Sequence, residues 1–141
     1  MDDKVEKVEK DTSKFDWVTK RSQCSYPNVF KTLRLEVEED VKARNGLRPE
    51  NSPYEFSVTE NGGSFTVLLA GKLDGKDLRK AVTFSLAERA IMVLDDQGKQ
   101  MFEITLAFND QGECKVRVNE DERELWQVRR MALEELMFRT N

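Results

Sequence analysis

The stretch "YEFSVTENGGSFTVLL", residues 54–69, decides the fold, because its apolar side chains recur at every second position on both sides of a turn. Alternation with a period of two indicates strands with one buried face, and Asn-Gly-Gly is typical of a tight hairpin turn. The segment therefore predicts an antiparallel hairpin. Its inward-facing residues are Tyr54, Phe56, Val58, Phe65, Val67 and Leu69.

The same period continues to about residue 118, interrupted by the short turns "AERA", "DDQGKQ" and "NDQG". Strands joined by short turns pair with their neighbours in the chain, so the sequence predicts a six-stranded antiparallel β-meander. The two similar motifs "DDQG" and "NDQG" are consecutive turns and fall at opposite ends of such a sheet. We therefore expect them to supply turn geometry and not to share a metal ion.

A helix is expected over residues 25–46, with Ser25 as N-cap, Pro27 in the first turn and Gly46 just past the end. Four residues at helical spacing give it one apolar stripe: Phe30, Leu33, Val37 and Val41.

A second, long helix is expected from Asn119 to the C-terminal region, with Glu122 completing a capping box. Its apolar side is wide, and we expect Trp126, Leu133 and Met137 to be buried there. Together the patterns predict an α+β fold: an N-terminal helix, a six-stranded antiparallel β-meander and a long C-terminal helix, with both helices packed on one face of the sheet.

The 141 residues are enough for one domain. We expect residues 1–13 to be a flexible charged tail and residues 14–141 to be a single α+β domain. In "KFDWVTK", three residues alternate with their neighbours, which favours a short first strand: Phe15, Trp17 and Thr19.

With that first strand, the element order resembles a compact helix-grip fold, although it has one helix where that family usually has two. The resemblance rests on element order over residues 15–139 and on no sequence motif. It implies a pocket for a small apolar ligand between the sheet and the C-terminal helix. The pocket candidates are Phe65, Phe84, Phe102, Leu106, Trp126 and Leu133. The alternative is that these side chains pack against the helices and leave no cavity.

The chain contains no histidine, and this excludes several chemistries. Imidazole is the usual general base near neutral pH, the usual partner of a Ser or Cys nucleophile and the commonest metal ligand. Glycine-rich phosphate-binding motifs are missing as well. We therefore expect a protein that is not an enzyme, with no cofactor and no metal.

The net charge of −4 argues against nonspecific binding to nucleic acid or to anionic lipid. We expect a cytoplasmic protein, because the charged N-terminus lacks an apolar core of signal-peptide length and no window approaches about 18 consecutive apolar residues. Reduced thiols are then expected for Cys24 and Cys114. The number of cysteines alone does not exclude a disulfide between them.

Cys24 lies beside Lys20 and Arg21, just ahead of the first expected helix. Cations and a helix N-terminus favour an activated thiolate, but catalysis by a thiolate usually needs a proton-transferring partner, and histidine is absent. The sequence therefore favours Cys24 as a packing residue.

The connection "GKLDGKDLRK", residues 71–80, is longer than a hairpin turn needs and is rich in cations. We predict that it gathers with the linker 46–53 and the turn 95–100 at one end of the sheet, where it could bind an anion. The candidates for an anion or a partner are Lys72, Lys76, Arg79, Lys80 and Lys99.

Among these possibilities we favour a non-catalytic interaction module that binds another protein or a second copy of itself. The surface considered is the solvent-facing side of the sheet, which carries residues of mixed character: Thr66, Thr83, Glu103, Thr105, Lys115 and Arg117. The alternatives are the small apolar ligand and the anion site described above.

Overall fold

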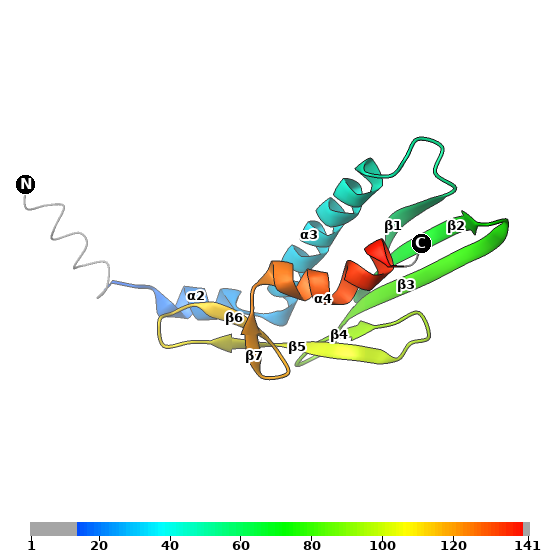
Figure 1. Ribbon diagram of the computed structural model, residues 1–141. Coiled ribbons are helices and arrows are strands. Elements are labelled where there is room, and N and C mark those ends of the chain that lie inside the picture. Colours follow the sequence, from blue (N-terminus) through cyan, green and yellow to red (C-terminus); the bar gives the residue numbers. More distant parts are fainter. Residues whose placement is uncertain (1–13, 140–141) are drawn as a thin grey trace, which may run out of the picture.

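A single antiparallel sheet of seven strands forms the framework of the protein in the computed structural model, which describes residues 14–139 (Figure 1). Each strand pairs with the next along the chain, which confirms the predicted meander. The strands are β1 (Tyr54–Asn61), β2 (Ser64–Leu73), β3 (Lys76–Leu86), β4 (Ile91–Leu94), β5 (Gln100–Phe108), β6 (Cys114–Val118) and β7 (Asp121–Arg123).

The seventh strand replaces the expected start of the C-terminal helix. Asn119 and Glu120 adopt positive φ angles of 54° and 71° and make a tight turn, so Asn119 is not an N-cap. Helix α4 spans Leu125–Phe138 and is capped by Glu124, whose side chain and that of Gln127 form the capping box. The prediction placed the same type of cap five residues too early, because four of the residues 120–124 are acidic and offer several similar starts.

Helix α3, Tyr26–Gly46, confirms the first predicted helix. The Ser25 hydroxyl accepts a hydrogen bond from the Asn28 backbone N–H at 3.3 Å, and the predicted apolar stripe is buried. The end differs by one residue, because Gly46 is still helical and Leu47 is the C-cap.

Helix α2, Trp17–Gln23, occupies the segment where a short strand was expected. Asp16 caps it by accepting hydrogen bonds from the Thr19 backbone N–H at 3.1 Å and the Thr19 hydroxyl at 2.6 Å. The alternation was too short to outweigh this local cap, and the first strand on which the helix-grip resemblance depended is not formed. The predicted tail, residues 1–13, lies outside the described residues.

Residues 71–80 form a hairpin and not the long connection that the sequence suggested. β2 and β3 pair without interruption to Leu73 and Lys76, and only Asp74 and Gly75 turn the chain. Both turn residues have positive φ, 54° and 78°, as a two-residue hairpin turn requires. Asp-Gly is a strong signal for such a turn, but the cations around it hid the strand pattern.

The motifs "DDQG" and "NDQG" form equivalent turns, as predicted. The Asp95 carboxylate accepts hydrogen bonds from the backbone N–H groups of Gln97 and Lys99, each at 2.9 Å. Asn109 does the same for Gln111 and Glu113. Because they join β4 to β5 and β5 to β6, they lie at opposite ends of the sheet.

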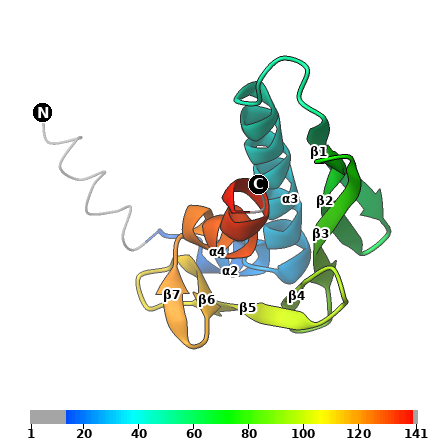
Figure 2. The ribbon, with the colours of Figure 1, turned by 45° about the vertical axis from the view of Figure 1, so that its right-hand side comes forward.

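The sheet curves around the helices, and α3 and α4 both pack on its concave side (Figure 2). This confirms that one face of the sheet carries the core. The aromatic centre of that core is tightly filled: the Phe65 and Phe84 rings stack at 4.7 Å, and Phe30 lies 5.2 Å from Phe65.

Cys24 and Cys114 form a disulfide that ties the start of α3 to the edge of β6, with a Cα–Cα distance of 5.3 Å. The prediction of reduced thiols is therefore wrong for this structure. Cys24 is buried, as expected of a packing residue, but it has no free thiol to act as a nucleophile. Among residues 14–139, no helix combines the length and the apolar character needed to cross a membrane.

Candidate functional site

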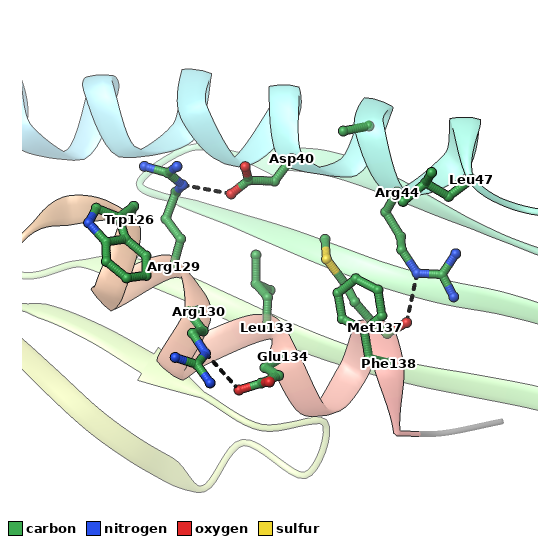
Figure 3. Close-up of a pocket in the computed structure, with 11 residues that line it drawn as sticks. Asp40, Arg44, Leu47, Trp126, Arg129, Arg130, Leu133, Glu134, Met137 and Phe138 are labelled. Atoms are coloured by element: carbon green, nitrogen blue, oxygen red, sulfur yellow. Dashed lines mark hydrogen bonds and ion pairs between the residues drawn. The ribbon is translucent and has the colours of Figure 1, made fainter.

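A groove of about 390 Å³ runs between α3 and α4 (Figure 3). We call it the interhelical groove. Its rim carries large apolar side chains that are unusually exposed: Leu47 at 73%, Trp126 at 53% and Phe138 at 59%. Its other lining residues are Asp40, Ala43, Arg44, Arg129, Arg130, Leu133, Glu134 and Met137.

Two of the three arginines in this groove are neutralised by carboxylates. The Arg129 Nη1 and Nε atoms donate to Glu36 and Asp40 of α3, each at 2.6 Å, and this fork fixes the spacing of the two helices. Arg130 pairs with Glu134 one turn further along α4 at 3.0 Å. Arg129 is a charged residue on the otherwise apolar side of α4, and its ion pairs with Glu36 and Asp40 link α4 to α3.

Arg44 is the exception among the three. Its side chain is only 9% exposed, and its Nε atom donates to the backbone carbonyl of Met137 at 2.8 Å. Its guanidinium lies 5.0 Å from the rings of both Phe56 and Phe138. Among residues 14–139, it forms an ion pair with no carboxylate.

A second surface is the convex side of the sheet, opposite the described helices (Figure 2). The strand register places an uncharged group of side chains together on β1–β4, and the Thr66 and Thr83 hydroxyls are 2.8 Å apart at its centre. We call this group the outer patch. Its members are Ser57, Thr59, Thr66, Leu68, Ala70, Ala81, Thr83, Ser85, Met92 and Leu94.

The charged residues that the sequence assigned to this face lie beside the outer patch and not within it. Glu103 and the uncharged Thr105 belong to β5, and Lys115 and Arg117 belong to β6, whereas Thr66 and Thr83 face each other on β2 and β3. The face is therefore not evenly mixed in charge. The outer patch is uncharged, whereas the same face of β1–β3 carries charged residues toward the β2–β3 turn, among them Glu55, Lys72 and Arg79.

The six predicted pocket residues do not share one cavity. Phe65, Phe84 and Phe102 are buried in the core, and Leu106 packs against it. Leu133 is buried as expected and contributes to the interhelical groove. Trp126 lines the same groove but is exposed, contrary to the expected burial.

The five predicted cations are exposed but divided between the two faces of the hairpin. Strand alternation places Lys72 and Arg79 on the convex side, and Lys76 and Lys80 on the opposite side. Lys72 pairs with Asp77 at 3.0 Å, and Lys99 lies in the β4–β5 turn. The structure thus brings no more than two of the hairpin cations onto one side.

Two surface carboxylates have perturbed titration. Hydrogen bonding from Thr19 lowers the pKa of Asp16 below its usual value, and hydrogen bonding from Asn109, with the nearby charge of Lys115, lowers the pKa of Glu113. Both lie near the disulfide end of the molecule and not in the interhelical groove. Within residues 14–139, no group of three or more acidic or cysteine side chains could hold a metal ion.

Comparison of the chain with protein-family models, with curated proteins and with solved structures finds no match. The function must therefore be argued from the geometry of the two surfaces.

Proposed function

We propose that this chain is a non-catalytic protein-interaction module whose outer patch binds a second copy of the chain. The observation that carries the proposal is that ten uncharged side chains are neighbours on the convex face of β1–β4, in a chain in which 35% of the residues are charged. Charged side chains are depleted at the centres of protein interfaces, because an ion buried there loses its hydration.

The charge pattern favours a second copy over an unrelated partner. In a two-fold symmetric dimer each patch meets itself, so a patch with a net charge would repel its own copy. The outer patch is uncharged, and residues of both signs border it: Glu55 and Arg79 lie on either side of Ala70, and Glu103 lies opposite Met92. Self-association therefore carries no electrostatic penalty at the centre and allows opposite charges to meet at the rim.

The size of the patch requires the rim to take part. With ordinary strand spacing and rise, the ten residues of the outer patch cover about 320 Å². A specific interface buries about 800 Å² on each partner. The charged rim must then supply the remainder, and the dimer should weaken as salt screens its ion pairs.

The experiment places a charge at the centre of the outer patch and measures mass by sedimentation equilibrium. Leu68→Lys and Ala81→Glu should each shift the wild-type dimer to monomer, because both signs are equally costly in a buried neutral interface. Leu35→Lys is the matched control, since Leu35 is exposed on α3 outside both surfaces. Circular dichroism checks that each variant is folded.

Dissociation by both patch variants with an unchanged Leu35→Lys variant supports the proposal. A dimer that survives both patch substitutions places the interface elsewhere and refutes it.

A further inference from the structure

The interhelical groove has an unbalanced charge inside an apolar lining. Arg129 and Arg130 are each neutralised by carboxylates on the protein, whereas Arg44, buried more deeply than either, has none among residues 14–139. A buried cation is costly unless it is paired. The carbonyl of Met137 and the two flanking rings offset part of this cost. Both helices also end near Arg44, and the partial negative charge of a helix C-terminus stabilises a cation there, but this is less than the full charge of a carboxylate.

The arrangement of the groove has a direction. Figure 3 shows Arg44 beside Met137 and Phe138 at one end of the groove and Trp126 near the other end. Leu133 lies between these two ends. Trp126 and Met137 are separated along α4 by about 16 Å, which is close to the length of an extended chain of about twelve carbons. One end of the groove thus suits an anion. The remainder also contains charged side chains, but Arg129 and Arg130 are paired there with Asp40 and Glu134, and apolar side chains such as Leu133 and Trp126 offer contacts for an apolar chain.

We propose that the interhelical groove binds a small amphipathic carboxylate, a fatty-acid-like molecule whose carboxylate meets the Arg44 guanidinium and whose chain lies toward Trp126. The guanidinium presents its N–H groups in a fork that matches a carboxylate. The volume of about 390 Å³ lies within the range of small-molecule sites. The site is separate from the outer patch and does not depend on dimerisation.

The probe is dodecanoate, and the readout is the fluorescence of Trp126. The chain has a second tryptophan, Trp17, on α2, so the titration uses a Trp17→Phe background in which Trp126 reports alone. Dodecan-1-ol has the same chain without the carboxylate. We expect saturable binding of dodecanoate, and binding of the alcohol about tenfold weaker or more, because the charge-assisted hydrogen bonds are lost.

Two pairs of variants locate the site. Ala43→Phe places a ring in the groove from an exposed position and should abolish binding, whereas Lys42→Phe places the same ring on α3 outside the groove lining and should leave it unchanged. Arg44→Met should remove the preference for dodecanoate over the alcohol. The Leu68→Lys variant should bind dodecanoate like the wild type, which separates this proposal from the dimer.

Equal affinity of wild-type protein for dodecanoate and dodecan-1-ol would overturn the proposal, because Arg44 would then recognise no carboxylate. Equal loss of binding in Ala43→Phe and Lys42→Phe, or the absence of any saturable fluorescence change, would overturn it as well.

Discussion

Removal of the Cys24–Cys114 disulfide should cost a large part of the stability of the fold. The bond joins residues separated by 90 positions, so it restricts most of the described chain in the unfolded state. In the chain-entropy account, a closed loop of this size stabilises the folded state by about 4 to 5 kcal/mol. For a domain of this length, that corresponds to a melting temperature lower by about 15 °C.

Two ways of removing the disulfide should each lower the free energy of unfolding, measured by urea unfolding followed by circular dichroism. Reduction of the wild-type protein with dithiothreitol removes the bond and keeps both side chains, whereas the double variant Cys24→Ala, Cys114→Ala also removes the sulfur atoms. The double variant should lose somewhat more stability, because Cys24 is buried and alanine leaves a small void. Dithiothreitol should have no effect on the double variant, which serves as the control for nonspecific effects of the reagent.

A loss of less than about 1 kcal/mol on reduction would refute the reasoning, since the cross-link would then restrict little of the unfolded chain. Two thiols that react with a thiol reagent in the native, unreduced protein would show that the bond is not formed.

Three other changes test separate parts of the structure. Arg129→Met should destabilise the fold by about 1 to 2 kcal/mol, because it leaves two half-exposed carboxylates unpaired between α3 and α4; a double-mutant cycle with Asp40→Asn isolates the coupling, and a zero coupling energy would contradict it. Gly71→Ala should cost about 2 kcal/mol or more in urea unfolding, because its Cβ would overlap the backbone carbonyl of Pro53 at a φ of +148°. Gly46→Ala is the control and should not destabilise the fold, because nothing lies within 4 Å of the added Cβ. The pKa of Asp16 is lower in the folded state, so its ionised carboxylate stabilises the fold at pH values above the unfolded pKa, and this contribution disappears as the pH falls through the folded pKa. Thr19→Val should raise the pKa of Asp16 in an NMR titration, because it removes the hydroxyl hydrogen bond. An unchanged titration midpoint would argue against the cap.

The sequence predicted the meander and α3 well, because their signals repeat over many residues. Phe56, Val67 and Phe84 belong to an alternation that spans the whole sheet, and each is buried. The missed elements are short: α2 has seven residues and β7 has three, so a single cap or turn decides each of them. Periodicity carries little information at that length.

The two candidate surfaces were harder to predict, since both depend on contacts between distant parts of the chain. The neutral centre of the outer patch depends on strand register, which brings Leu68 opposite Ala81 and Thr66 opposite Thr83. Arg44 gave one usable signal, because it follows Val41 at helical spacing on an otherwise apolar stripe. That no carboxylate of residues 14–139 pairs with it follows only from the arrangement of α3 and α4 in space.

The most direct test of the proposed module is the mass of the wild-type protein measured by sedimentation equilibrium over a wide range of concentration and at two salt concentrations. A self-associating outer patch predicts a reversible rise from 16.4 kDa to twice that mass, with weaker association at high salt. A constant mass of 16.4 kDa at every concentration would contradict the account, because the outer patch would then have no affinity for its own copy.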